Sequence, residues 1–408
     1  MQMPSLHLNL GRRPAADLVG LDIQPGFVAA VQARLNGSVV VERAVAVPLA
    51  ADTVRDGEVT DQSALTDALR ELFAGSGLNK RVRVGVANQR TVLRTLELPP
   101  VTDRKELAAA VGFQAQDQVP MPLSNAVLDF HALGVIDTPA GPRQRVVLVA
   151  AQRDMIERLL AAVREAGLRP EGVDLSAFAL IRSLYRVPQS EDADANQAAE
   201  RVLYLNVDGL TNLAIAEGHV CRFTRVVGAG MEGIAGEVAE RRGIAIAEAR
   251  ELLAAVDLKA PAQPELAASM PEGTGHDAEP SAGPLEDAAE DAGGAEDEPD
   301  EQVEQHAPEG GSDADVRMVL ERGIHDIAGE VRNSLDFHRS QDGGGEVTRV
   351  VLSGSALDLQ GFADALQSQL RVDVQPQTVS VADQSLVGKL STHRLAIAAG
   401  LATTEIHQ

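Results

Sequence analysis

The fold is decided by residues 19–49, which read VGLDIQPGFVAAVQARLNGSVVVERAVAVPL. Three apolar runs in this stretch are separated by the sequences QPG and NG, and both have the composition of tight hairpin turns. The segment that follows, 61–73, places leucines at helical spacing on one face, and Asp61 or Ser63 is suited to cap its first turn. The sequence therefore predicts a β-β-β-α unit.

The same order of elements returns in the second half of the chain. Three apolar runs, VLYLNVD, NLAIAEG and VCRFTRVV, lie within residues 202–227 with glycine-containing turns between them, and a predicted helix follows at 231–242. Asp22 and Asn206 stand at equivalent positions near the end of each first strand, 184 positions apart. A repeat of this length indicates two similar lobes that face each other and not a solenoid of short repeats.

Two further regions complete the predicted architecture. Residues 81–186 lie between the two units and alternate strands with helices, in the proportions of a ferredoxin-like α+β insertion. After the second unit, residues 349–370 read as a strand, a turn and a helix. We expect the segment 393–402 to form a helix that packs on the second lobe.

The negative charge of the chain is concentrated in one segment. The formal net charge is -24, but residues 261–315 hold 17 acidic residues and no Lys or Arg, so the remainder carries only -7. This segment has few large apolar side chains, and burial could not offset the entropy lost on ordering it, so we expect a disordered acidic loop. Apolar residues are spaced as in a helix in the two segments that flank this loop, 245–256 and 315–338. A tolerated insertion and a tether for a basic partner both fit such a loop.

Composition excludes several classes of function. Trp is absent and aromatic residues make up 2% of the chain, so a nucleic-acid partner, which would need a base-stacking platform or a basic surface, is not expected. Cys221 is the one cysteine and the His residues are scattered, which argues against disulfides and a metal site. The longest apolar runs are far shorter than the roughly 18 residues of a membrane span, so we expect no direct membrane insertion.

Four segments in the insertion and just after it narrow the class of protein. They are VLRTLELP at 92–99, FQAQDQVPMP at 113–122, VLVAAQR at 147–153 and AGLRPEGVDLSAFALIR at 166–182. In combination they resemble the PilM family of type IV pilus assembly proteins, which belongs to the actin-like ATPase superfamily and is related to the division protein FtsA. The resemblance runs from about Leu18 to Leu401, outside the acidic loop.

The resemblance implies a mixed α/β, actin-like two-lobe fold of duplicated βββα units with an inserted α+β subdomain. The expected parts are an N-terminal tail (1–17), the first lobe (18–88 with 172–198), the insertion (89–171), the second lobe (199–256 with 316–408) and the acidic loop (257–315).

The resemblance also implies a function. Members of the family are cytoplasmic scaffolds held at the inner face of the cell membrane, because they bind the N-terminal peptide of the inner-membrane protein PilN and work with other pilus assembly components. In the family this peptide lies in a groove between the first lobe and the insertion, and the motifs alone do not identify the residues of that groove. A small-molecule kinase of the same superfamily, an FtsA-like filament protein and a type II secretion scaffold remain alternatives, and self-association stays open.

A nucleotide site is implied by the same resemblance. In the superfamily the two first-hairpin turns hold the phosphates of ATP through backbone N–H groups and a small hydroxyl, and acidic residues at the strand ends hold Mg²⁺. The residues of this chain at the matching positions are Asp22, Gly26, Asn206, Gly209, Thr211, Gly228, Gly230, Glu248, Gly354 and Ser355.

The sequence departs from that pattern in four places. Pro25 has no N–H to donate, Phe27 stands where a small hydroxyl is usual, Asn206 replaces an acidic residue, and Leu253 replaces a Lys. We therefore expect a partly eroded site for ATP and Mg²⁺. No residue is identified that would polarise the attacking water, so we expect weak or absent ATP turnover.

The N-terminal tail carries a pattern of its own. Apolar and polar residues alternate and are followed by basic ones, and this resembles the N-terminal peptide of PilN itself. The residues that carry the pattern are Leu6, Leu8, Asn9, Leu10 and Arg12. A frayed leader or an extra edge strand would fit these residues, and so would a segment that competes with the partner for the groove of its own chain or of a second copy.

Overall fold

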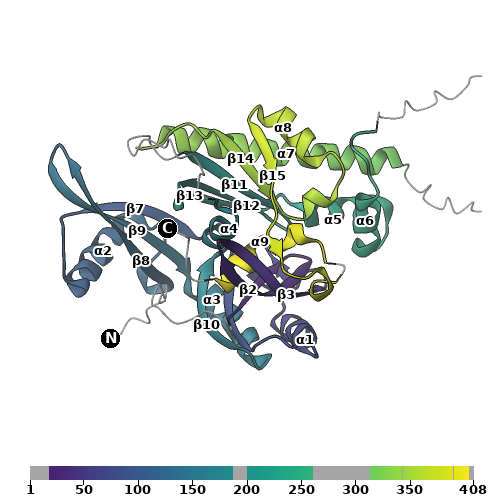
Figure 1. The fold of residues 1–408 in the computed structure, drawn as a ribbon, viewed down its shortest axis with the longest axis horizontal. Coiled ribbons are helices and arrows are strands. Elements are labelled where there is room, and N and C mark those ends of the chain that lie inside the picture. Colours follow the sequence, from purple (N-terminus) through teal and green to yellow (C-terminus); the bar gives the residue numbers. More distant parts are fainter. Residues whose placement is uncertain (1–17, 187–199, 261–312, 342, 389, 404–408) are drawn as a thin grey trace, which may run out of the picture.

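The computed structural model describes residues 18–186, 200–260, 313–341, 343–388 and 390–403. The tail that carries the PilN-like pattern and nearly all of the acidic loop lie outside these ranges. The described residues form four sheets, of which the smallest is a two-stranded hairpin (Figure 1).

The first lobe is built on a six-stranded sheet. In spatial order its strands are β10 (Arg169–Leu175), β6 (Arg81–Val86), β1 (Val19–Gln24), β2 (Phe27–Asn36), β3 (Ser38–Pro48) and β16 (Ser380–Val381). The strands β1, β2 and β3 form an antiparallel meander, and β6 runs parallel to both β1 and β10. The first turn of the meander contains Gly26 with φ +86°, a conformation that residues with a side chain rarely adopt. A short hairpin of β4 (Val54–Arg55) and β5 (Glu58–Val59) follows.

Helices cover both faces of this sheet. The outer face packs against α1 (Gln62–Phe73) and α3 (Arg153–Glu165), and the inner face packs against α4 (Ser176–Leu184) and α9 (Ala396–Ala402). Asp61 caps α1, because its Oδ1 accepts a hydrogen bond of 2.9 Å from the N–H of Ala64. Leu65, Leu69 and Leu72 are buried, so the predicted helix and its apolar face are confirmed.

The second lobe repeats this topology. Its five-stranded sheet has the spatial order β13 (Val220–Val227), β12 (Thr211–Glu217), β11 (Arg201–Val207), β14 (Arg349–Ser353) and β15 (Asp373–Pro376). An antiparallel meander is again followed by two strands parallel to its first strand. The outer face is covered by α5 (Met231–Arg242), α6 (Ile246–Ala254), α7 (Asp313–Ser340) and α8 (Phe362–Leu370). The matching order of strands confirms the predicted duplication.

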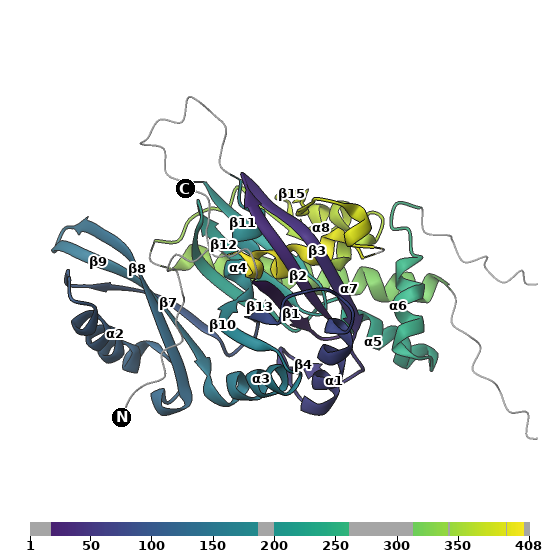
Figure 2. The same cartoon turned by 60° about the horizontal axis from the view of Figure 1, so that its bottom comes forward.

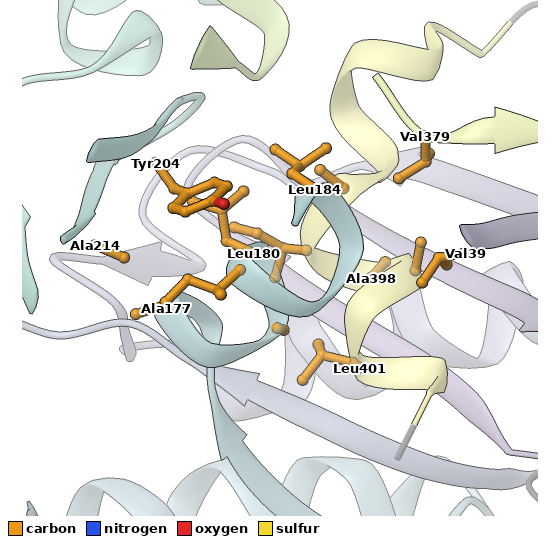
Figure 3. Close-up of a cluster of buried hydrophobic side chains, with 14 of the residues drawn as sticks. Val39, Ala177, Leu180, Leu184, Tyr204, Ala214, Val379, Ala398 and Leu401 are labelled. Atoms are coloured by element: carbon orange, nitrogen blue, oxygen red, sulfur yellow. The ribbon is translucent and has the colours of Figure 1, made fainter. Parts of the chain in front are cut away.

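A shared apolar core lies between the two sheets. Leu180 and Leu184 of α4 pack toward Tyr204 and Ala214 of the second sheet, and Ala398 of α9 lies on the side of Val39 (Figure 3). A methyl group at Gly20 would overlap the carbonyl oxygen of Ala398. The lack of a side chain at this position therefore lets α9 lie directly against β1.

The C-terminal part of the chain returns to the first lobe, which corrects our expectation for 393–402. The helix α9 contacts β1, β2 and β6, and β16 pairs with β3. The sequence HRLAIAAGLA is apolar on nearly every face, so its pattern predicts a buried helix without identifying the sheet that buries it.

The inserted subdomain has its own three-stranded sheet, with the order β7 (Val92–Leu98), β9 (Gly141–Gln152) and β8 (Ala126–Thr138). The helix α2 (Arg104–Gln118) packs on one face of it. Figures 1 and 2 show this subdomain at one end of the long axis, with α5 and α6 at the other end. The described residues also include four short 3₁₀ helices, of which the first lies in this subdomain: η1 (Leu123–Asn125), η2 (Ser355–Asp358), η3 (Gln384–Leu386) and η4 (Thr392–Leu395).

The inserted subdomain ends before residue 171, the boundary that we expected, because α3 and the start of β10 lie with the first lobe. The helix α3 packs against α1, and β10 pairs with β6 from Arg169 onward, so both belong to the first lobe. The apolar stripe of α3 identifies a buried face, but a stripe does not reveal which of two neighbouring sheets buries it.

Within the described residues no helix is both long enough and apolar enough to cross a lipid bilayer.

Candidate functional sites

The turns of the two lobes meet at one point, and we call residues 24–27 and 208–211 the interlobe turns. A methyl group on Gly209 would overlap the carbonyl oxygen of Pro25 across the two lobes. A methyl group on Gly230 would lie 2.6 Å from the carbonyl oxygen of Gly209. The turns therefore touch each other through their backbones.

Asp22 lies beneath this contact at the end of β1. Its side chain is buried, with 2% of the residue exposed, and Oδ2 accepts a hydrogen bond of 2.9 Å from Nε2 of Gln24. Burial raises the pKa of the Asp22 carboxyl to about 7; the hydrogen bond from Gln24 lowers it, and the nearby carboxyl of Asp208 raises it further. A substantial fraction of Asp22 is therefore protonated near neutral pH.

Asp208 is a buried carboxyl of the second lobe at the position equivalent to Gln24, and it was not among the predicted site residues. Its Oδ1 accepts a hydrogen bond of 2.8 Å from the N–H of Ser355, and its Oδ2 accepts one of 3.1 Å from Nδ2 of Asn206. Ser353 in turn donates to Oδ1 of Asn206 at 2.8 Å. Burial raises the pKa of Asp208, while Arg394, whose Nε lies 3.9 Å from Oδ1, opposes that shift. Its position directly before Gly209 was the signal that could have identified it.

Charged side chains of the second lobe close over the first turn. Arg250 of α6 and Glu232 of α5 form an ion pair, with Nε of Arg250 3.0 Å from Oε2 of Glu232. A methyl group on Gly26 would overlap that carboxylate and would lie 3.0 Å from Arg250. The guanidinium of Arg394 stacks over the ring of Phe27, 5.1 Å from its centre.

The remaining predicted residues lie at several different places in the structure. Gly228 faces the side chains of Gln89 and Asp56, at 3.2 and 3.4 Å from where its Cβ would be. Gly354, with φ +102°, lies against the backbone of Val207. Glu248 is exposed on α6 and Leu253 is buried in the core of the second lobe.

The geometry permits a test of whether ATP and Mg²⁺ fit between the interlobe turns. Backbone contact between Pro25 and Gly209, and the Glu232–Arg250 ion pair against Gly26, occupy the space in which phosphates would lie. Oε1 of Gln24 and Oγ1 of Thr211 are buried there with no hydrogen-bond partner in the part of the chain that the structure describes. These two polar atoms lack hydrogen-bond partners, as the atoms of a ligand site can. The contacts between the turns nevertheless leave no room for the nucleotide and its metal in this arrangement.

A second candidate site lies between the first lobe and the insertion, at two sheet edges that pair with no other strand among the described residues. The strand β10 is one end of the six-stranded sheet, and β8 is one end of the three-stranded sheet. A depression opens between them, and we call it the insertion groove. Its lining residues are Val86, Val127, Asp129, Val149, Ala151, Ile156, Val173, Asp174, Leu175 and Phe178.

The walls of the insertion groove are apolar, with two carboxylates. Val149 of β9 stands opposite Asp129 of β8 in the antiparallel register. Asp174 forms an ion pair with Arg182 and accepts a hydrogen bond of 2.8 Å from the N–H of Leu175. Sequence reasoning missed these residues, because the edges of two different sheets meet only in the folded chain.

Two repeated meanders with facing turns, and helices between their sheets, define an actin-like fold. A solved structure described as a PilM-PilN type IV pilus biogenesis complex has this fold: its TM-score is 0.66, it is 20% identical, and the match covers 95% of this chain and 98% of that one.

The chain itself belongs to the family described as type IV pilus assembly protein PilM, whose family model matches residues 20–263. The predicted family and fold class are thereby confirmed.

More distant similarities extend to other solved structures. The ethanolamine utilization protein EutJ from Carboxydothermus hydrogenoformans is 14% identical, with a TM-score of 0.47 over 94% of this chain and 88% of that one. MreB5 of Spiroplasma citri bound to ADP is 11% identical, with a TM-score of 0.46 over 95% of each chain.

Proposed function

We propose that this chain is a scaffold of the type IV pilus assembly platform that binds the N-terminal peptide of a PilN-like inner-membrane protein in the insertion groove. The observation that carries the proposal is the groove itself, which lies between two unpaired sheet edges and has apolar walls. Membership in the PilM family supports the assignment of the partner.

The groove suits an extended peptide for two physical reasons. An edge strand offers unpaired backbone N–H and C=O groups, and a peptide that adds to the edge satisfies them. Side chains alternate across an added strand, so every second one would enter the apolar walls formed by Val149, Val173 and Phe178.

The proposed partner also determines where the chain works. A scaffold that holds the N-terminal peptide of an inner-membrane protein is located at the inner face of the membrane through that protein, together with other pilus assembly components. We propose no membrane contact by the chain itself.

We also propose that the scaffold works without bound ATP and Mg²⁺. Two observations support this proposal. The two interlobe turns touch each other, and Asp208 accepts hydrogen bonds from Ser355 and Asn206 of the same chain. The small-molecule kinase is disfavoured for the same reason, because a kinase needs an open phosphate site.

The test is a binding titration with two ligands. A fluorescein-labelled peptide of the first 15 residues of the PilN-like protein of the same organism should bind the full chain, measured by fluorescence anisotropy, with a Kd in the micromolar range or below. A scrambled peptide of the same composition should not bind. Equal binding of the two peptides would contradict the proposed function.

A further inference from the structure

The described chain begins near the insertion groove. Leu18 directly precedes β1. Val19 of β1 and Pro170 of β10 both pair with Val82 of β6, and the three strands are parallel, so β1 and β10 start at the same end of the sheet. The strand β10 is the end strand of that sheet, and its last three residues, 173–175, line the groove. The chain that precedes Leu18 is therefore about one strand length away from the groove.

The residues before Leu18 are numerous enough to reach the groove. The distance from Pro170 to Leu175 along β10 is about 17 Å, and β10 lies about 10 Å across the sheet from β1, so the separation to be spanned is about 20 Å. An extended segment of residues 11–17 spans about 23 Å. Residues 6–10 therefore reach the part of β10 that lines the groove.

This path also determines the direction of the added segment. The chain would run from the groove back to Leu18, which is opposite to the direction of β10. An antiparallel neighbour forms direct hydrogen bonds with the N–H and C=O groups of an edge strand. Pro14 has no N–H to donate, so the pairing would end before the chain reaches the start of β1.

The sequence of residues 6–10 suits an edge strand with one apolar face. Leu6, Leu8 and Leu10 alternate with His7 and Asn9. In an extended strand the three leucines point to one side. In a helix Leu8 would lie opposite the other two, so the three leucines would not form one apolar face.

The groove offers apolar surface to such a face. Val149 of β9, Val173 of β10 and Phe178 of α4 line it, and each is only half-buried among the described residues. Leucine side chains placed against them would remove apolar surface from water on both sides of the contact, which the hydrophobic effect favours. Figure 2 shows β10 on the side of the first lobe that faces the insertion, where no other described strand pairs with its edge.

We propose that residues 6–10 add as a strand to the edge of β10 in the insertion groove of their own chain and compete there with the partner peptide. The inference rests on the proposed function and adds regulation to it, because the partner must displace a segment that is tethered to the same fold. The tether gives this segment an effective concentration on the order of 1 mM, far above the concentration of a second copy in solution. The tail therefore fills the groove of its own chain.

A weak contact is sufficient for this competition. If the separate tail peptide has a Kd of about 100–500 µM, an effective concentration of about 1 mM fills about two thirds to nine tenths of the grooves. The affinity for a competing ligand then falls by about 3- to 10-fold.

Hydrogen–deuterium exchange measured by mass spectrometry tests the contact without any partner. The proteins are the full chain, the chain that lacks residues 1–13, and the full-chain variants Leu8→Asp and His7→Asp. We expect the segment 172–175 to exchange about 3- to 10-fold more slowly in the full chain than in the truncated chain, because the added strand protects edge amides. Leu8→Asp places a charge on the apolar face and should exchange like the truncated chain. His7→Asp is the matched control, because its charge points to water, and it should keep the protection.

Binding of the PilN-like peptide is then measured on the same four proteins by fluorescence anisotropy. The truncated chain and Leu8→Asp should bind it about 3- to 10-fold more tightly than the full chain and His7→Asp. All four proteins retain the whole described fold, because β1 begins at Val19.

The outcomes separate this inference from the proposed function. Equal exchange of the segment 172–175 in the full and truncated chains would overturn the inference and leave the proposed function standing. Protection by the tail, with no binding of the PilN-like peptide to any of the four proteins, would overturn the proposed function. Protection that grows with protein concentration, with dimers detected by light scattering, would overturn the assignment of the tail to the groove of its own chain.

Discussion

The interlobe turns and the insertion groove both include residues of the first lobe, and they differ in whether the chain satisfies its own surfaces. At the turns, backbone touches backbone, an ion pair closes over Gly26, and Asp208 receives two hydrogen bonds from its own lobe. At the groove, two sheet edges end side by side with apolar walls between them. On our proposal, an actin-like fold replaces its ligand site by internal contacts and keeps a binding surface elsewhere.

The difference between the two regions indicates which of them is the better candidate for binding a ligand. A surface that the chain completes by itself has little to gain from a ligand, whereas an unpaired edge gains backbone hydrogen bonds from any matching strand. The four predictions below test one side of the comparison or the other.

The largest effect is expected in the insertion groove. Val149→Arg adds a bulky cation among the apolar walls and should weaken binding of the PilN-like peptide by about 100-fold, because it fills the groove and repels basic residues. Circular dichroism and the melting temperature check that the variant is folded. Fluorescence anisotropy measures the affinity.

The matched control is Val135→Arg. Val135 lies on β8 of the same subdomain, but it is 59% exposed and is not part of the groove. Unchanged affinity in Val149→Arg, or an equal loss in Val135→Arg, would show that the groove is not the peptide site.

The next effect concerns the contact between the turns. Gly209→Ala places a methyl group against the carbonyl oxygen of Pro25, so one lobe must move, and we expect a loss of about 3 kcal/mol in the free energy of unfolding. Gly233→Ala is the control, because its methyl group meets nothing within 4 Å on α5 and should add about 0.5–1 kcal/mol. Chemical denaturation measures both. Equal stability of the two variants would mean that the turns do not touch.

The third effect depends on pH. Asp22 has a pKa of about 7 in the folded chain against an ordinary value of 3.8, so the folded state holds a proton that the unfolded state releases between these values. Stability therefore falls as the pH rises from about 4 to 7, and the whole penalty is present above 7. Asp22→Asn removes it and should be more stable than the unchanged protein at pH 8, on the order of 1–2 kcal/mol, but not at pH 4.

The control for this titration is Asp137→Asn, which replaces an exposed aspartate on β8. Melting curves at pH 4, 6 and 8 should change little in this control. A gain in Asp22→Asn that is the same at every pH would contradict a buried carboxyl that titrates near neutrality.

The smallest effect concerns the N-terminal tail. If residues 6–12 enter the groove as their sequence pattern indicates, deletion of residues 1–13 should tighten binding of the PilN-like peptide by about 3- to 10-fold, because a tethered competitor is removed. Unchanged affinity together with an unchanged oligomeric state, measured by light scattering, would exclude this role.

The sequence predicted what is local and repeated. Turn glycines, apolar alternation and the cap at Asp61 are short-range signals, and they identified the meanders, the helices and the duplication. It did not assign α9 and α3 to the correct sheet, because an apolar stripe does not name its partner. The insertion groove is formed by the edges of separate sheets, so no single stretch of sequence contains it.

The most direct test of the account is one calorimetric experiment, in which the PilN-like peptide is titrated into the full chain with and without 1 mM Mg-ATP. We predict the same Kd in both titrations and no heat when Mg-ATP is added alone, because the turns are occupied by protein and the groove is open. Micromolar binding of Mg-ATP that is lost in Asp22→Ala, or a peptide affinity that changes several-fold with nucleotide, would contradict the account.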